Sequence, residues 1–287
     1  MLVTTLHCVP RFLAAAFFEG SILDWTTHDF LFSFLEAPID GLFLNLCINN
    51  STKLVSVSRN VSREAKLTCQ DIPPEKMVVI PNGIDFDKFD NLKRAFGSEA
   101  KEEGENILFS GRLTTGKGVF LLVEAVAMLK KHFPNVKLRI VGAGPALNRL
   151  RRKVRKLGLS PNVDFLGYLP NLDAMREMLR SSIVALPSSY EGGGPLTILE
   201  AMALSKPTVA FSYPFARESI EDFYTGLLAR PGDSLDLAEK IRILIDDRNL
   251  RYRLGANAFH RVYRENNWEN LVDCYVRVYL EATASKI

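Results

Sequence analysis

The sequence is poor in the residues that build zinc sites and disulfide frameworks. It contains only four cysteines and four histidines in 287 residues. The cysteines are Cys8, Cys47, Cys69 and Cys274, which are scattered and form no C-x-x-C pair. The histidines add no zinc-ligand spacing to them, so neither a zinc site nor a disulfide framework is implied. We interpret the cysteines as isolated reduced thiols of a cytosolic protein and predict no metal site.

Long apolar runs and a strong net charge are also missing. Glu19, Asp24 and Asp29 interrupt the apolar N-terminal stretch, so no run approaches the roughly 18 residues of a membrane-spanning helix. Residues 1–9 lack a basic start, and we therefore expect no signal peptide. The net charge of +3 gives no global reason to bind nucleic acid. These features predict a cytoplasmic protein without a nucleic-acid partner.

Short apolar strands alternate with amphipathic helices in the second part of the chain. Strands are predicted at 106–110, 136–142, 163–166, 182–186, 207–211 and 226–229. This alternation is typical of an α/β fold in which helices cover both faces of a parallel sheet. Ligands of such sheets bind beyond the carboxyl ends of the strands. The strand-to-helix loops are therefore the candidates for a site.

The first part of the chain contains fewer predicted elements. Strands are expected at 2–6, 53–57 and 77–80, and Ser58 is expected to cap a helix that runs to about Leu67. We predict four parts: a partial N-terminal domain (1–85), a charged linker (86–104), a C-terminal domain (105–265) and a C-terminal helix (266–287) that packs back on the N-terminal part.

The loop from Gly111 to Gly118 nearly matches the phosphate-binding G-x-x-x-x-G-K-[ST] motif. Gly118 stands where that motif needs Ser or Thr to hold magnesium, and no apolar strand ends in an Asp that could be the second metal ligand. An ATPase is therefore disfavoured. Arg112, Lys117 and the backbone N–H groups of a helix N-terminus remain, and together they favour phosphate. The alternative is a solvated basic turn.

A second glycine-rich loop follows the strand predicted at 136–142. Gly142 and Gly144 begin a G-x-G-x-x-G pattern, but Leu147 occupies its third glycine position. A dinucleotide site is therefore weakly indicated. The glycines fit either a plain tight turn or a turn that a ligand or a neighbouring loop approaches closely.

The loop before the helix predicted at 195–204 carries three consecutive glycines, whose unshielded amides can receive an anion. Pro195 is expected to pre-set the first turn of that helix. Glu200 lies about one and a half turns into it, in apolar company, where an unpaired carboxylate is costly. Its partner is either a pair of ribose hydroxyls, which a carboxylate accepts in bidentate fashion, or a surface lysine or arginine.

Six segments, in order, resemble the motifs of the retaining glycosyltransferases of family 4, which have the GT-B fold. They are P-N-G-I-D at 81–85, G-R-L…K-G at 111–118, V-G-A-G-P at 141–145, V-D-F-L-G at 163–167, the glycine loop with Glu191 and E-A-M-A at 200–203, and P-G-D at 231–233. The resemblance implies a complete Rossmann-like C-terminal domain and a partial Rossmann-like N-terminal domain.

The resemblance also implies roles for individual residues. Arg112 and Lys117 would neutralise the donor diphosphate in place of a metal, Glu200 would hold the ribose and Glu191 would face the donor sugar. His7 would lie at a strand end and face the donor phosphate across the cleft. The implied catalytic residues are therefore His7, Glu191, Arg112 and Lys117.

The implied donor-binding residues come from all the loops described above, and residues 163–167 would lie near the base. They are Gly111, Arg112, Lys117, Gly142, Gly144, Gly167, Glu191, Gly192, Gly193, Gly194, Pro195, Leu196, Thr197 and Glu200. The donor is expected to be a UDP- or GDP-linked sugar, no cofactor is required, and the acceptor would be a carbohydrate or a lipid-linked molecule.

Three features depart from the family pattern. Glu191 and Glu200 are one residue further apart than in the family, which puts the role of Glu191 in doubt. Ala216-Arg217-Glu218 keeps only the acid of the family's G-G-x-x-E. The segment before Pro81 matches only the later part of a first domain, so residues 1–48 would rearrange, oligomerise or bind a partner chain.

These observations favour a metal-independent, retaining hexosyltransferase that uses a nucleotide-diphosphate sugar. The alternatives are a non-catalytic nucleotide-sugar-binding subunit completed by a partner and, with less support, a GT-B epimerase. The basic residues at 149–156 fit either a solvated face or a peripheral contact, at the inner membrane surface, with anionic lipid or a polyanionic glycan.

Overall fold

The computed structural model describes residues 3–6, 15–16, 51–68, 72–97, 105–191 and 195–284. His7, Gly192, Gly193, Gly194 and most of residues 1–48 lie outside these ranges, and the predictions that rest on them stay predictions. The chain divides into two compact units. The first holds residues up to Gly83 together with Trp268 onward, and the second holds Ile84–Glu191 and Pro195–Asn267.

The first unit is built on a four-stranded sheet in the order β2-β1-β3-β4. Its strands are β1 (Val3–Leu6), β2 (Ala15–Ala16), β3 (Lys53–Ser56) and β4 (Met77–Val79). β1, β3 and β4 are parallel, and β2 pairs with β1 in the antiparallel sense. Helix α2 (Arg59–Thr68) follows β3, and the short 3-10 helix η1 (Pro74–Lys76) precedes β4.

Helices lie on both faces of β3 because successive side chains of a strand point to opposite sides. Leu54 packs with Val61 of α2, whereas Val55 packs with Leu271 and Val278 of α11 (Trp268–Ala284). The Val61 N–H donates to the Ser58 hydroxyl oxygen at 3.1 Å, as expected of a helix cap.

The second unit is built on a fully parallel sheet in the order β7-β6-β5-β8-β9-β10. The strands are β5 (Asn106–Ser110), β6 (Lys137–Val141), β7 (Val163–Gly167), β8 (Ile183–Leu186), β9 (Thr208–Phe211) and β10 (Gly226–Ala229). The chain order along the sheet is therefore 3-2-1-4-5-6, the order of a doubly wound Rossmann sheet. The strands fall where the sequence predicts them, within a residue at each end.

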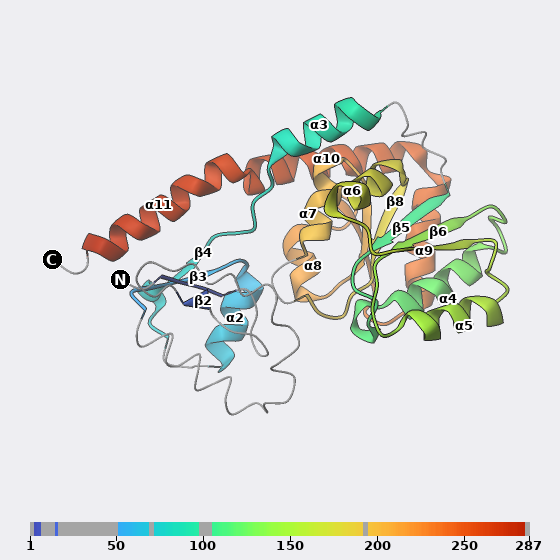
Figure 1. Cartoon of the computed structure of the whole chain (residues 1–287), viewed down its shortest axis with the longest axis horizontal. Helices are drawn as coiled ribbons and strands as arrows, with labels where there is room; N and C mark the ends of the chain where they lie inside the picture. Colours follow the sequence, from blue (N-terminus) through green and yellow to red (C-terminus); the bar gives the residue numbers. More distant parts are fainter. Residues whose placement is uncertain are drawn as a thin grey trace. The chain divides into compact units, whose positions relative to one another are not determined.

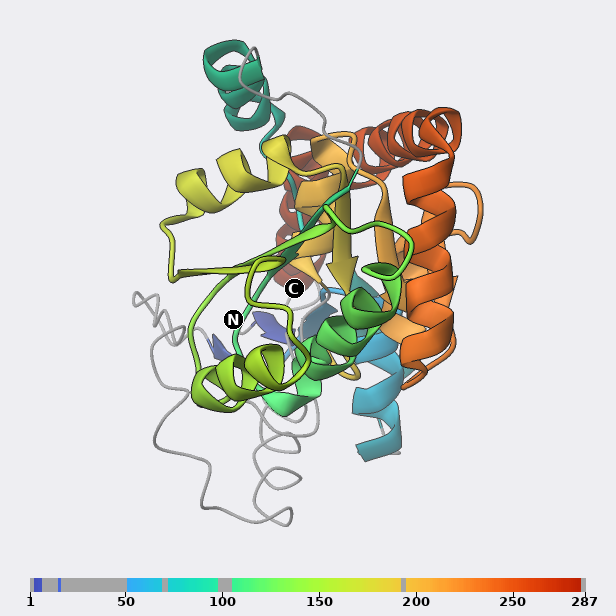
Figure 2. The same cartoon turned by 90° about the vertical axis from the view of Figure 1, so that its right-hand side faces the viewer.

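Two layers of helices bury this sheet (Figure 1, Figure 2). One face carries α4 (Val119–Leu129), α5 (Leu147–Lys156) and α9 (Ser234–Asp246). The other carries α3 (Phe86–Phe96), α6 (Asn171–Arg180), α7 (Leu196–Ala203), α8 (Pro214–Ser219) and much of α10 (Arg248–Asn266). Fully buried Ile107 and Phe109 of β5 face the first layer and Leu108 faces the second, which explains why these strands are apolar throughout.

The predicted linker at 86–104 begins with a helix rather than with irregular chain. Asp85 caps α3 by accepting a hydrogen bond from the Lys88 N–H at 3.3 Å. Phe86, Phe89 and Leu92 of α3 are buried in the second helix layer. Their spacing of three residues places them on one face of the helix. The charged residues between them make this short apolar face hard to recognise in the sequence.

The crossing of α7 and α10 gives a test of the packing. A Cβ added at Gly255 of α10 would lie 2.1 Å from the carbonyl oxygen of Ser205, which follows α7. Because backbone atoms cannot give way, we expect Gly255→Ala to lower the free energy of unfolding by about 1–3 kcal/mol. Urea unfolding followed by circular dichroism measures this change.

Gly97→Ala is the matched control. Gly97 ends α3 with a helical φ of −60°, and nothing lies within 4 Å of its added Cβ. Alanine there restricts the unfolded chain, so the free energy of unfolding should stay the same or rise by about 0.4–1 kcal/mol. If both variants lost the same free energy of unfolding, the close approach of Gly255 to the Ser205 carbonyl oxygen would be contradicted.

Candidate functional site

The order in which strands are added to the sheet of the second unit changes side between β5 and β8. β6 and β7 extend the sheet on one side of β5, whereas β8, β9 and β10 extend it on the other. The loops that follow β5 and β8 therefore start from neighbouring strands and lead to opposite sides of the sheet. This is the topological switch point, where α/β sheets bind their ligands.

Hydrogen bonds and an ion pair join these two loops. Ser189, after β8, donates to the Gly116 carbonyl oxygen from its backbone N–H at 2.9 Å and from its hydroxyl at 3.0 Å. The ammonium group of Lys117 lies 2.5 Å from a carboxylate oxygen of Glu191. The structure thus brings together two of the predicted site residues, both partly buried.

Gly118 determines how closely the loops approach each other. Its φ is +67°, and an added Cβ would lie 1.8 Å from the Pro187 carbonyl oxygen. A Ser or Thr at this position would meet both the unfavourable φ and the clash. The departure from the magnesium-binding P-loop, noted in the sequence, therefore has a steric cause.

The glycine loop after β6 packs against the loop after β5. An added Cβ at Gly142 would lie 1.9 Å from the Gly111 carbonyl oxygen, and one at Gly144 would lie 2.4 Å from that of Leu113. The Leu113 N–H donates to the Ala143 carbonyl oxygen at 2.9 Å. Of the two interpretations left open by the sequence, close approach by a neighbouring loop is the one that the structure shows.

Glu200 lies on α7, half-buried beside the buried Leu199 and Met202. Burial raises the pKa of its carboxyl group above the ordinary value, although a hydrogen bond from Asn171 and the charge of Lys88 act in the opposite direction. The Asn171 side-chain amide donates to Glu200 at 3.4 Å, and the Lys88 ammonium group donates to the Asn171 amide oxygen at 2.7 Å. The lysine thus reaches Glu200 through an intervening amide rather than in a direct ion pair.

The remaining predicted residues are placed as follows. Arg112 is exposed on the loop after β5, and Gly167 ends β7, where its carbonyl oxygen accepts from the Gly142 N–H at 2.7 Å. Pro195 immediately precedes α7 instead of forming its first turn. Leu196 is 51% exposed and Thr197 is half-buried.

Sequence reasoning missed Asn171 and Lys88. Asn171 begins the helix that follows β7, so it lies at the carboxyl end of a parallel strand, where ligand-facing side chains gather. That position could have drawn attention to it. Lys88 gives no such signal, because it lies in the segment that resembled a linker.

Two features are absent from the described residue ranges. No helix in those ranges is long and apolar enough to cross a membrane. No group of three or more His, Cys, Asp or Glu side chains in them has the arrangement of a metal site. The independence from metal stays a prediction.

Comparisons with known proteins agree with this geometry. Residues 91–261 match the family described as glycosyl transferases group 1. The chain belongs to this family.

Two curated relatives illustrate the range of group 1 glycosyl transferases that this chain resembles. An uncharacterized glycosyltransferase of Methanocaldococcus jannaschii is 31% identical over 80% of this chain and 60% of its own length. The glycogen synthase of Mycobacterium tuberculosis is 29% identical over 72% of this chain and 49% of its own. The chain thus spans less than two thirds of the length of these relatives.

Solved structures show the same fold. HepE of Anabaena, crystallised in complex with UDP-glucose, superposes with a TM-score of 0.72 at 22% identity and covers 84% of this chain and 68% of its own. The predicted fold class, an α/β protein of GT-B type, is confirmed.

The half-buried carboxylate of Glu200 gives a test that needs no ligand. Because burial raises its pKa, ionised Glu200 destabilises the folded protein at pH values above its folded-state pKa. We expect Glu200→Gln to raise the melting temperature at neutral pH. This gain should shrink as pH falls through the raised pKa and vanish below the ordinary glutamate pKa of 4.5, where both side chains are neutral.

Thermal unfolding of the two proteins across this pH range measures the difference. Glu239→Gln is the control, because Glu239 is exposed on α9 and Arg242 lowers the pKa of its carboxyl group. A difference in melting temperature between Glu200→Gln and the native protein that does not change with pH would contradict the raised pKa of the Glu200 carboxyl group.

Proposed function

We propose that this group 1 glycosyl transferase binds a nucleotide-diphosphate sugar at the carboxyl end of the sheet, against the loops after β5 and β8. The observation that carries the proposal is the meeting of Lys117 and Glu191, at 2.5 Å, at the topological switch point of the sheet. A cation held at this place, beside the start of α4, favours the binding of a phosphate group. The chain would transfer the sugar to a carbohydrate or lipid-linked acceptor.

The diphosphate would lie against Lys117, Arg112 and the backbone N–H groups that begin α4. These groups stabilise the negative charge that develops on the departing nucleoside diphosphate, which is the main electrostatic demand of glycosyl transfer. Glu191 already pairs with Lys117, so an incoming phosphate competes with a carboxylate for the same ammonium group. This competition favours ligands that give Glu191 new partners, and the hydroxyl groups of a donor sugar are such partners.

Glu200 would accept hydrogen bonds from the two hydroxyl groups of the ribose. Burial raises the pKa of the Glu200 carboxyl group because it disfavours the ionised form. Two hydroxyl groups that donate hydrogen bonds to the carboxylate would offset the cost of burying its charge. The UDP-glucose complex of HepE supports a UDP-linked hexose as donor.

We further propose that transfer proceeds without a metal and with retention at the anomeric carbon. The steric exclusion of Ser or Thr at position 118 supports the first point, because it removes the side chain with which a P-loop holds magnesium. Retention follows from the resemblance to family 4, in which the acceptor attacks the face that the leaving phosphate vacates.

The central test of the donor site is the Lys117→Ala variant. Loss of a hydrogen bond to a charged group costs about 1.5–3 kcal/mol, so the affinity for UDP-glucose should fall about tenfold or more. Isothermal titration calorimetry measures this affinity. A chelator added to the titration should leave the affinity unchanged. Lys130→Ala is the matched control, because Lys130 donates to the Gly158 carbonyl oxygen away from these loops.

Glu191→Gln gives a change of opposite sign. It frees Lys117 from its carboxylate partner, so the affinity for UDP itself should rise while the preference for UDP-glucose over UDP falls.

Slow release of UDP from UDP-glucose by the native chain would distinguish a transferase from a non-catalytic binder. An affinity for UDP-glucose that is the same in Lys117→Ala as in the native chain would refute the proposed donor site.

A further inference from the structure

Helix α5 carries an unusual density of positive charge. Its ten residues include Arg149, Arg151, Arg152, Lys153, Arg155 and Lys156, and no acidic residue. The sequence leaves open whether these side chains form a solvated face or bind something. Five of them, all but Lys156, divide into two groups with different surroundings.

The first group is turned toward α4 and has partners within the fold. Lys153 forms an ion pair with Glu124, and its ammonium group lies 5.8 Å from the centre of the Phe120 ring. The guanidinium group of Arg149, one turn earlier, lies 5.3 Å from the centre of the same ring. These contacts account for the cations on this side of the helix.

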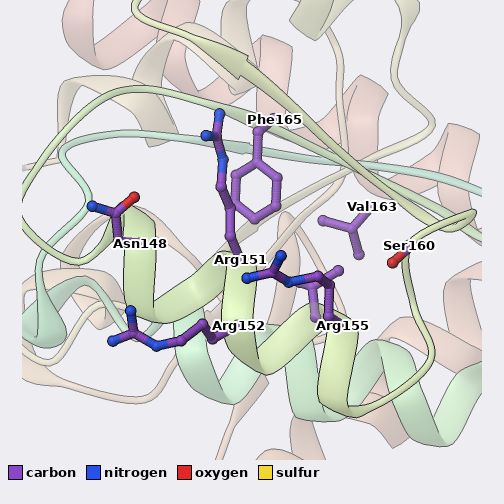
Figure 3. A pocket seen from close by; sticks show the side chains of 8 residues that line it. Asn148, Arg151, Arg152, Arg155, Ser160, Val163 and Phe165 are labelled. Atoms are coloured by element: carbon purple, nitrogen blue, oxygen red, sulfur yellow. The ribbon is translucent and has the colours of Figure 1, made fainter.

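The second group lines a hollow of about 450 Å³ between α5 and the edge strand β7. Asn148, Arg151, Arg152 and Arg155 follow one another at the spacing of one helical face. Val163 and Phe165 of β7 and Ser160 before it complete the wall. Figure 3 shows the Arg151 side chain running alongside the Phe165 ring, which its guanidinium group approaches to 5.7 Å from the ring centre.

The residues that line this hollow include no carboxylate. Among the described residues, none of the three arginines forms an ion pair or hydrogen bond with an acidic side chain. Asp164 lies between Val163 and Phe165 in β7, so it points to the opposite face of the strand. The lining is therefore cationic, neutral polar or apolar throughout, and the described part of the chain supplies no counter-ion to its positive field.

We propose that this hollow is a second anion site, which binds the phosphate group of a phosphorylated organic molecule. Guanidinium groups match phosphate oxygens with paired N–H donors, and Ser160 and Asn148 add neutral donors. Val154, Val163 and Phe165 form an apolar wall that suits the organic part of the ligand. The volume lies within the usual range of small-molecule pockets, roughly 300–1,000 Å³, so it accommodates more than a bare ion.

The hollow lies away from the loops after β5 and β8 that are proposed to bind the donor phosphates. Of its lining residues, only Val163 and Phe165 belong to the segment that the family resemblance places near the donor base. The phosphate group can belong to a soluble ester or to the headgroup of an anionic lipid. Both present the same chemistry to the arginines, and the experiment separates them.

Binding is measured on the full chain with two probes of matched chemistry. Glycerol 3-phosphate, followed by calorimetry, is the soluble probe. Vesicles of phosphatidylcholine, alone or mixed with an equal amount of phosphatidylglycerol, are the lipid probe in co-sedimentation. Saturable binding of either phosphate probe, without binding to pure phosphatidylcholine, is the expected result and identifies the source of the phosphate.

Three double variants locate the binding. Arg151→Gln with Arg155→Gln should weaken it about tenfold or more, because charge-assisted hydrogen bonds are lost. Arg149→Gln with Lys156→Gln removes the same charge from α5 outside the hollow and should leave the affinity nearly unchanged. Arg151→Lys with Arg155→Lys keeps charge and aliphatic stems, and should still weaken binding severalfold because the paired donors are gone.

Thermal unfolding checks that each variant is folded, and the lysine variant preserves the test if the glutamine variant is not. An equal loss of affinity in both glutamine double variants would overturn the proposal, because binding would then depend only on the net charge of the helix. Full affinity in the lysine variant, or no binding of either phosphate probe, would overturn it as well.

Discussion

The close approach of Gly118 to the Pro187 carbonyl oxygen is the constraint on which the candidate site depends. Because Gly118 has no side chain, the loops after β5 and β8 can lie close enough for Ser189 to donate to the Gly116 carbonyl oxygen and for Lys117 to pair with Glu191. A larger residue at position 118 would separate the loops, because the obstacle is a backbone carbonyl group that cannot rotate away. The same contact excludes the side chain with which a P-loop would hold magnesium.

A second set of close contacts fixes these loops from the other side. Gly142 and Gly144 lie against the backbone of Gly111 and Leu113, so the loops after β5, β6 and β8 form one interlocked layer at the carboxyl end of the sheet. Such a layer presents its backbone N–H groups in fixed directions. Preorganised donors of this kind cost no reorganisation when charge develops on a ligand.

The sequence predicts much of this arrangement because the physics is local. β5 and β10 match their predicted bounds, since a buried parallel strand is apolar throughout and ends where glycine or polar residues begin. Gly118 already distinguishes the loop from a magnesium-binding motif. Ser58 caps α2 as its position before the helix suggests.

The parts that the sequence does not reveal depend on contacts between distant segments. Helix α3 looks like a linker because its apolar residues are few, and only the second helix layer gives them a place to pack. The path from Lys88 through Asn171 to Glu200 joins three helices, so no local pattern predicts it. The division of the α5 cations into a group that faces α4 and a group that lines the hollow beside β7 is of the same kind, because it is set by what lies beside each face.

The central claim is that Lys117 and Glu200 together hold a nucleotide-diphosphate sugar at the switch point without a metal. A crystal structure of the chain with UDP-glucose, grown in the presence of a chelator, tests it most directly. We predict that the diphosphate lies within hydrogen-bond distance of Lys117 and the ribose hydroxyl groups within reach of Glu200. A nucleotide bound elsewhere, or a diphosphate that binds only when a divalent metal is supplied, would contradict it.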